Sequence, residues 1–276
     1  MAWALVNKSR GDLAAAEALV AQALALKAHS YAYNILGMVK AQQGDFTEAA
    51  SQFAKAASEA SQSLTFVSNL AGALLLSGDV QSARRAYERA LGLRPGDCRT
   101  LISHANASMI LEDYKAADAS LRRCLERVPD NPAALSLLTL AQLEDGQVDT
   151  ARTTVEAVRR LRPAAADRLL AEIELREMKP QAAIDLLTPL ADDDEEVAYL
   201  LAYAHAINGE MDRAVELTNR VAAGTEQRTG PRAARMVFSA AANGVWAEPV
   251  DVAQDGTPGG KLLAFLDGCR LAAAGD

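Results

Sequence analysis

The stretch Leu64–Pro95, LTFVSNLAGALLLSGDVQSARRAYERALGLRP, reads as two short amphipathic helices joined by a Ser-Gly-Asp turn. Gly78 in that turn can adopt the left-handed conformation that ends a helix, because it has no Cβ. The carboxylate of Asp79 can then accept hydrogen bonds from the free N–H groups that open the next helix. Pro95 ends the second helix, since it lacks an N–H and its ring clashes with the preceding turn.

Two helices joined in this way can pack closely along one seam. Ala71 and Ala83 are small enough to allow the close approach. Leu70, Tyr87 and Leu91 are spaced to fill the seam between the helices. A single pair of this size cannot bury its apolar faces alone, so the stretch predicts further pairs stacked on both sides of it.

The same turn recurs along the chain. Its copies are Gly11-Asp12, Gly44-Asp45, Gly78-Asp79, Glu112-Asp113, Gly146-Gln147 and Gly209-Glu210. The three spacings between Gly44 and Gly146 are 34 residues each, and a small residue follows every turn five positions later. Those residues are Ala16, Ala49, Ala83, Ala117, Ala151 and Ala214. Prolines at positions 95, 129 and 163 are also 34 residues apart and are expected to close three units. Such a period indicates a helical repeat array.

This pattern resembles the tetratricopeptide repeat over residues 2–224. The resemblance implies an all-α fold, a right-handed α-solenoid of about seven stacked helix-turn-helix units with a C-terminal helical cap. The units are expected at residues 2–29, 30–63, 64–97, 98–131, 132–165, 166–194 and 195–224. The domain division is therefore a repeat array over 1–224 and capping helices with a loop over 225–276.

Two units depart from the pattern. The first is truncated, so Trp3, Leu5 and Val6 are predicted to lie at an open N-terminal end through which the protein could self-associate. The sixth is expected to have lost two residues from its turn at Met178-Lys179-Pro180, with Pro180 at the first position of the second helix, where its missing N–H costs nothing.

Composition narrows the classes of partner. The chain has 28 Lys and Arg against 36 Asp and Glu, a net charge of −8, which argues against nucleic acid because phosphate binding requires a basic face. RNA-binding pentatricopeptide arrays, the similar alternative, have 35-residue repeats and a basic groove. No apolar run approaches the roughly 20 residues of a membrane span. Cys98, Cys124 and Cys269 lack metal-like spacing and are expected to be reduced thiols in a cytoplasmic protein.

The sequence contains none of the common catalytic, metal-binding or cofactor-binding motifs, so we predict neither an enzyme nor a cofactor. His104 and His205 are expected to pack between helices, and the acidic run 192–196 to favour the start of the helix next to it. The arginines of the second helices are expected to form a solvated convex surface. They are Arg85, Arg89, Arg122, Arg123, Arg127, Arg152, Arg159 and Arg160.

The resemblance also implies a concave groove, lined by the first helix of each unit, that binds an extended peptide. The residues expected to line it are Tyr31, Asn34, Met38, Asn69, Arg99, Ser103, Asn106, Leu140, Glu174, Glu177, Tyr199 and Tyr203. An asparagine amide can donate to and accept from a peptide backbone at once. The acidic end of the groove, at Glu174 and Glu177, is expected to attract Lys or Arg of the ligand.

These features predict a non-enzymatic scaffold that binds a partner protein or peptide in its groove. The partner is expected to carry basic residues. The alternative is an accessory or substrate-presenting subunit of an enzyme or secretion complex. A clamp for the acidic tails of chaperones is not expected, because Asn69 and Arg99 lack the companion lysines that such clamps use.

Overall fold

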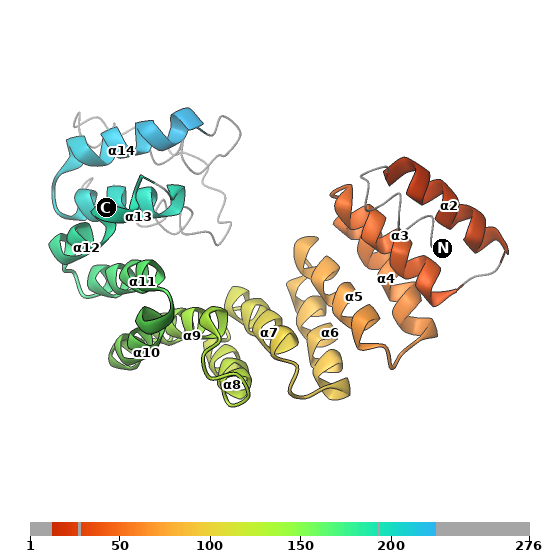
Figure 1. Cartoon of the computed structure of the whole chain (residues 1–276). Coiled ribbons are helices and arrows are strands. Elements are labelled where there is room, and N and C mark those ends of the chain that lie inside the picture. The colour runs from red at the N-terminus through yellow and green to blue at the C-terminus, as the bar shows by residue number, and fades with distance from the viewer. Residues whose placement is uncertain (1–12, 27–28, 193, 225–276) are drawn as a thin grey trace, which may run out of the picture. The chain divides into compact units, whose positions relative to one another are not determined.

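The computed structural model describes residues 13–26, 29–192 and 194–224, and these residues form helices and short connections without any strand (Figure 1). The chain divides into two units, residues 1–146 and 147–276. The truncated first helix around Trp3 and the predicted cap over 225–276 both lie outside the described residues.

The first unit consists of antiparallel helix pairs that succeed one another along the chain. Its helices are α2 (Leu13–Leu26), α3 (Ser30–Gln42), α4 (Phe46–Glu59), α5 (Leu64–Leu76), α6 (Val80–Leu93), α7 (Cys98–Ile110), α8 (Tyr114–Leu125) and α9 (Pro132–Glu144). Each helix packs against the next, both within a repeat and between repeats. The predicted stacking of helix pairs is confirmed.

The predicted turn chemistry is also confirmed. Gly44 and Gly78 have φ of 84° and 90° and come after the last residues of α3 and α5. Asp45 and Asp79 then cap the next helices, each accepting a hydrogen bond from the N–H three residues later, at 3.0 and 3.1 Å. Hydrogen bonds from Ser82, with its side chain contributing most and its backbone N–H next, lower the pKa of the Asp79 carboxyl group.

Glu112 takes the place of glycine in the turn that follows the one at Gly78, and still has φ of 59°. A left-handed backbone brings Cβ close to a carbonyl oxygen, which costs a non-glycine residue about 1–2 kcal/mol. Asp113, the next residue, caps α8 by accepting from the Ala116 N–H at 3.2 Å. The turn therefore forms in spite of this strain.

We expect Glu112→Gly to raise the free energy of unfolding by about 1 kcal/mol, because glycine removes the left-handed strain and loses part of that gain to backbone entropy. Gly78→Ala, the reverse change at the equivalent turn, should lower it by a similar amount. Urea unfolding followed by circular dichroism measures both. A Glu112→Gly variant that is less stable than wild type would contradict the strain assigned to this turn.

The second unit contains the remaining helices. They are α10 (Val148–Leu161), α11 (Pro163–Arg176), α12 (Pro180–Leu187), a 3₁₀ turn η1 (Thr188–Leu190), α13 (Glu195–Ile207) and α14 (Met211–Gly224). Asp194 Oδ1 accepts from the Val197 N–H at 3.4 Å, so one carboxylate of the acidic run does open α13 as expected.

Two residues are missing between helices α10 and α11, and the prediction that they are missing from the turn at Met178 is wrong. The sixth repeat is also shortened in α12, which has 8 residues where α10 has 14. Met178 has φ of 58° and the turn around it has the same length as the turn at Gly44, with Pro180 at the first helical position as predicted. By contrast, Arg162 alone joins α10 to α11, and Pro163 opens α11 instead of closing a unit. Each residue of α11 is therefore two positions closer to the left-handed residue that follows its helix than the 34-residue pattern predicts.

The packed interior combines small residues on both helices of a pair with larger ones between them. Ala71, Ala83 and Tyr87 are buried together with Ala107 of the next repeat. A second cluster joins the end of α6 to the next three helices. Its buried members are Leu91, Leu101, Ala105, Ala117, Leu121, Cys124, Ala134, Leu138 and Ala141.

Arg89 and Arg123 bind the backbone of the preceding repeat, which corrects the expectation that they are merely solvated, and Arg220 makes the same kind of contact. Arg89 donates to the carbonyls of Ala57 and Ser61 at 3.1 Å each, and Arg123 donates to the Pro95 carbonyl at 2.9 Å. Arg220 binds the carbonyl of Ala191 at 3.3 Å and the carboxylate of Asp192 at 2.8 Å. Each guanidinium satisfies carbonyls near the end of the previous second helix, which have no partner within that helix.

Candidate functional site

The first helices of successive repeats lie side by side in the first unit. α3 contacts α5, α5 contacts α7, and α7 contacts α9, although each pair is separated in sequence by a second helix. We call the outer side of this row the first-helix face. Several of its side chains are exposed to solvent: Tyr31, Thr65, Leu76, Arg99, Asn106 and Ile110.

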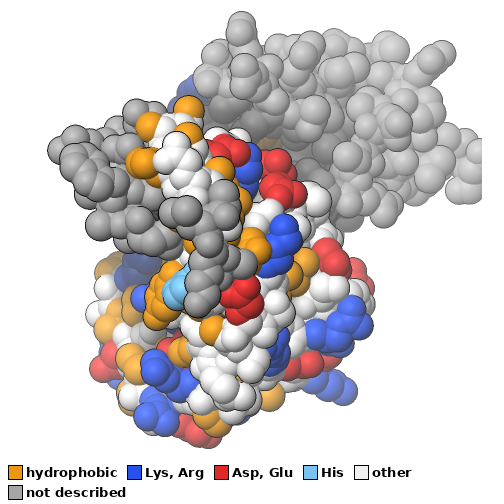
Figure 2. Space-filling view, turned by 90° about the vertical axis from the view of Figure 1, so that its right-hand side faces the viewer, with side chains coloured by type: hydrophobic (Ala, Val, Ile, Leu, Met, Phe, Trp, Pro, Cys, Tyr) orange, Lys and Arg blue, Asp and Glu red, His pale blue; other side chains and the backbone are white. Residues whose placement is uncertain are grey.

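The four helices of this face carry very few charges. α5 has no charged residue, α7 has only Arg99 and α9 only Glu144, while Lys40 of α3 is paired with Glu17 of α2 at 2.7 Å. The second helices α4, α6 and α8 carry eleven charged residues, against three on α3, α5, α7 and α9. In the view from the side of α2, acidic and basic side chains lie next to one another on the described surface (Figure 2). The scarcity of charge is therefore specific to the first-helix face, and protein interfaces are depleted of charge in the same way.

An amide pair crosses from one repeat to the next on this face. Asn69 Nδ2 donates to Asn34 Oδ1 at 2.8 Å, and Asn34 Nδ2 donates to Met38 Sδ at 3.6 Å. Asn34 is buried and Asn69 half-buried. This contact leaves the Asn69 carbonyl oxygen and a second N–H available to a ligand backbone. The structure thus brings together three of the residues predicted to line the groove.

The other predicted residues of this unit lie on α3, α7 and α9. Tyr31 is exposed and its ring meets Phe66 edge to face at 5.2 Å. Burial raises the pKa of Tyr87, whose hydroxyl forms an opposing hydrogen bond with Ser103. Arg99 and Asn106 are exposed on α7, and Leu140 is half-buried on α9.

Two apolar side chains on this face were not predicted from the sequence. Leu76 and Ile110 end α5 and α7, and their side chains are 63% and 53% exposed. They are 34 residues apart and therefore occupy the same position in adjacent repeats. That equivalence was the signal that could have found them. Beside them Gly72 is open, since a Cβ added there would meet only the Tyr87 hydroxyl, at 3.9 Å.

In the second unit, Glu174 and Glu177 are bound by a basic side chain of a second helix. Arg152 of α10 donates to Glu174 at 2.7 Å and to Glu177 at 3.0 Å, and Lys179 binds Glu177 at 2.7 Å. The pKa of Glu177 is lowered, mainly by its hydrogen bond with Lys179. The two carboxylates are therefore neutralised within the protein, and the acidic end predicted for a basic ligand is not open.

The register of α11 explains why these two glutamates are misplaced. Counting back ten and six residues from the left-handed Gly44 reaches Asn34 and Met38, whereas the same count from Met178 reaches Arg168 and Glu172. Arg168 and Glu172 form an ion pair at 3.4 Å. The same count from Gly209 reaches Tyr199 and Tyr203 on α13, which contacts α11, so these two predicted residues keep their place. Both tyrosines are half-buried.

A row of polar groups lies between α6, α7 and α8. His104 Nδ1 is 2.9 Å from Ser120 Oγ, and His104 Nε2 is 3.7 Å from Glu88 Oε1. Serine, histidine and a carboxylate in a row can activate a nucleophile. Here Ser120 and His104 are both buried, as predicted for His104, so the hydroxyl does not face a solvent-filled site. The row holds helices together. Burial lowers the pKa of His104, and the nearby Glu88 carboxylate opposes that shift.

This lowered pKa predicts a loss of stability in mild acid. The unfolded chain binds the proton of His104 more readily than the folded protein does, so the contribution of neutral His104 is complete above the ordinary pKa of 6.5. It is lost as the pH falls from 6.5 through the lowered folded value. We expect unfolding midpoints in urea to fall between pH 7.5 and 5, and His104→Gln to flatten this dependence. An unchanged slope in the variant would contradict the assignment to His104.

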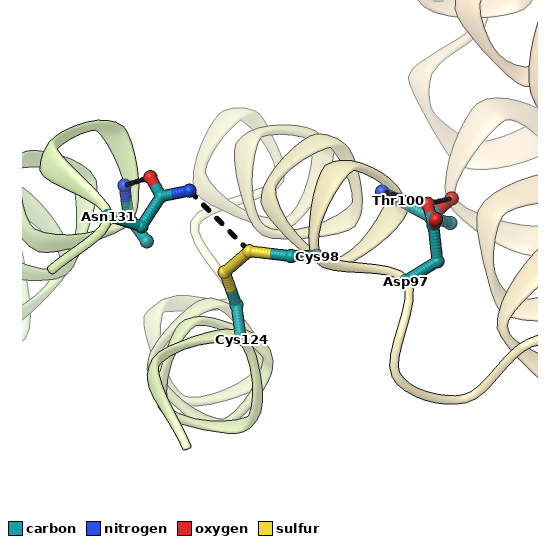
Figure 3. The surroundings of a disulfide bond; sticks show 6 residues. Asp97, Cys98, Thr100, Cys124 and Asn131 are labelled. Atoms are coloured by element: carbon teal, nitrogen blue, oxygen red, sulfur yellow. Dashed lines mark hydrogen bonds between the residues drawn. A yellow bond between two sulfur atoms is a disulfide. The ribbon is translucent and has the colours of Figure 1, made fainter. Parts of the chain in front are cut away.

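Cys98 and Cys124 form a disulfide between α7 and α8, with Cα atoms 4.7 Å apart, so the prediction of reduced thiols is wrong for this pair (Figure 3). The helix pair itself is the cause. Because α7 and α8 are antiparallel, the end of α8 lies beside the start of α7. The distance between the two Cα atoms is within the range that a disulfide spans.

None of the described helices has both the length and the apolar character needed to cross a bilayer. In residues 13–26, 29–192 and 194–224, no group of three His, Cys, Asp or Glu side chains could hold a metal ion.

Known proteins share this architecture. The chain is similar to a tetratricopeptide repeat protein of Parabacteroides merdae, with a TM-score of 0.76, 16% identity, and coverage of 86% of this chain and 96% of that one. It is similar to a chain of the APC/C hetero-tetramer Cut9–Hcn1, with a TM-score of 0.61, 16% identity, and coverage of 80% and 45%. For pilF of Pseudomonas aeruginosa the TM-score is 0.57, with 17% identity and coverage of 77% and 97%.

No curated protein matches the chain. Comparison with family models, however, agrees with the structural likeness. Two family models, both described as tetratricopeptide repeat, match residues 1–64 and 36–97 in one case and 109–173 in the other. The matched segments span more than half of the 276 residues, and the described turns within them have left-handed residues at Gly44, Gly78, Glu112 and Gly146. The chain belongs to the tetratricopeptide repeat family.

Proposed function

We propose that this protein is a non-enzymatic scaffold that holds an extended segment of a partner protein on the first-helix face of its first unit. Members of the family generally mediate protein–protein interactions. The observation that carries the proposal is the Asn69–Asn34 amide pair, which lies on a face almost without charge. The exposed Leu76 and Ile110 beside it offer apolar contact area.

The chemistry of the face specifies the kind of segment. Amide groups of Asn69 and Asn106 can bond the backbone of an extended chain regardless of its sequence. Leu76 and Ile110 favour apolar side chains, and the open surface at Gly72 lets a backbone approach closely. We therefore propose a neutral, partly apolar segment. Basic residues in the ligand have less support, since Glu174 and Glu177 are already paired with Arg152.

Photo-crosslinking tests where the partner binds. A photoreactive phenylalanine analogue is placed at Ser68 or Asn106 on the first-helix face, and at Arg85 or Ala119 on the second helices as matched controls. Irradiation in the native cell should join a partner protein to the first two positions and leave the last two unlinked. Adducts that form equally from Arg85 and Ala119 would place the partner on the second helices and refute the proposed face.

A cytoplasmic location remains a prediction. A permanent disulfide is typical of oxidising compartments, whereas a reversible one is compatible with the cytoplasm. The redox behaviour of the Cys98–Cys124 pair therefore bears on the location as well as on the chemistry of the protein.

A further inference from the structure

The two sulfurs of the Cys98–Cys124 disulfide lie in different surroundings. Cys124 has no exposed surface and sits in the apolar cluster with Leu101 and Leu121. Cys98 is partly exposed and is the first residue of α7. The amide of Asn131 donates to Cys98 Sγ at 3.7 Å from the other side (Figure 3). Of the two bonded residues, only Cys98 has exposed surface.

We propose that this pair is a thiol–disulfide exchange site, in which small thiols react at the sulfur of Cys98 and the opened site carries the thiol adduct on Cys98. The attacking species in such exchange is a thiolate, which requires access to the sulfur it attacks. Access selects Cys98. In the opened pair, Cys98 stands at a helix N-terminus, where the backbone N–H groups and the dipole favour its thiolate, so Cys98 is also the more reactive thiol of the reduced site.

The exchange proceeds in two balanced steps. The thiolate of a small thiol bonds to Cys98 Sγ, the bond between the two cysteines breaks, and the electron pair leaves on the Cys124 sulfur, which takes a proton from solvent. A second thiol then attacks the outer sulfur of the adduct and releases the Cys98 thiol. Two thiols are oxidised to their disulfide, and the protein disulfide gains two electrons and two protons.

The burial of Cys124 determines the lifetime of the adduct. A thiolate at this position is a charge inside an apolar cluster, which is costly to maintain. It is also held close to Cys98, so it re-forms the original bond and expels the small thiol. The adduct on Cys98 is accordingly short-lived unless Cys124 is blocked or removed.

The Asn131 side chain connects this site to the next repeat. Its Oδ1 accepts from the Ala134 N–H at 3.0 Å and so caps α9, while its Nδ2 contacts Cys98. An adduct on Cys98 occupies the space next to that amide, one residue before Arg99 of the first-helix face. The exchange site is thus a modification site at one edge of the face.

Single-cysteine variants test the proposal directly, in a Cys269→Ser background that leaves only the pair. Glutathione disulfide is the probe, and the adduct is monitored by intact-protein mass spectrometry. Cys98 in Cys124→Ser should form the adduct at least about tenfold faster than Cys124 in Cys98→Ser, and concentrated urea should make the two rates equal. Equal rates in the folded proteins, or faster reaction at Cys124, would overturn the proposal.

A second measurement avoids substitutions that could disturb folding. The wild-type protein is exposed briefly to reduced glutathione, quenched with acid and mapped by peptide mass spectrometry. The adduct should be found on the peptide containing Cys98 and be absent from the peptide containing Cys124. An adduct found on the peptide containing Cys124 would contradict the proposed direction of attack.

Discussion

Replacing Leu121 with alanine is expected to lower the free energy of unfolding by about 3–5 kcal/mol, because a large side chain is removed from a close-packed cluster. Leu121 has no exposed surface and packs in the cluster that joins α6, α7, α8 and α9. The lost contacts and the remaining cavity both contribute to the cost. Equilibrium unfolding in urea, monitored by circular dichroism at the helical band, gives the change.

Leu76→Ala is the matched control. It removes the same atoms from the same kind of residue, but the Leu76 side chain is 63% exposed, so the expected change is within about 0.5 kcal/mol. A loss at Leu76 equal to that at Leu121 would mean that Leu76 is buried in solution. Such a result would remove Leu76 from the first-helix face.

Reducing the Cys98–Cys124 disulfide is expected to cost about 3 kcal/mol of unfolding free energy. The two cysteines are 26 residues apart, and the crosslink restricts the unfolded chain by closing that loop. Wild-type protein should therefore unfold at a lower urea concentration with a dithiol reductant than without it. The amino-acid sequence is the same in both samples, so no substitution complicates the comparison.

The variant with alanine at both positions 98 and 124 is the control, and its unfolding midpoint should not respond to the reductant. A wild-type midpoint that stays the same after complete reduction would show that the crosslink does not stabilise the fold. A shift of equal size in the variant would assign the effect to the reductant itself.

The turns at Gly44 and Gly78 were predictable because their chemistry is local. A left-handed glycine followed by an aspartate defines where one helix ends and the next begins, and the backbone confirms both positions. The 34-residue period then carries the same assignment along the chain. Asn34 and Asn69 were assigned to the groove from that register, and the structure joins them by a hydrogen bond.

The sixth repeat was misread because its turn has no glycine. Met178 occupies the left-handed position, which sequence rules assign to glycine, so the missing residues were placed in the turn instead of at Arg162. Because of this error in register, Glu174 and Glu177 were assigned to positions of α11 that line the groove. The pairing of both with Arg152 depends on tertiary packing that the spacing of residues does not contain.

The disulfide and the arginine contacts had signals that went unused. Cys98 begins α7 and Cys124 lies near the end of α8, and these two places meet at the same end of any antiparallel pair. Arg89, Arg123 and Arg220 each come six positions after the small residue of their repeat. A cation that repeats at a fixed position indicates a repeated contact, and these three bind the backbone of the preceding repeat.

The binding role of the first-helix face is the central claim, and Gly72→Leu tests it most directly. A side chain at Gly72 has open space above it and would block a ligand on the face without disturbing the core. Ala119→Leu places the same side chain at an exposed position of α8. Affinities of both variants for the segment identified by crosslinking can be measured by isothermal titration calorimetry. We predict that Gly72→Leu weakens binding at least about tenfold and that Ala119→Leu leaves the affinity unchanged. The two binding free energies should then differ by about 1.4 kcal/mol or more. Wild-type affinity in Gly72→Leu, or a loss confined to Ala119→Leu, would contradict this claim.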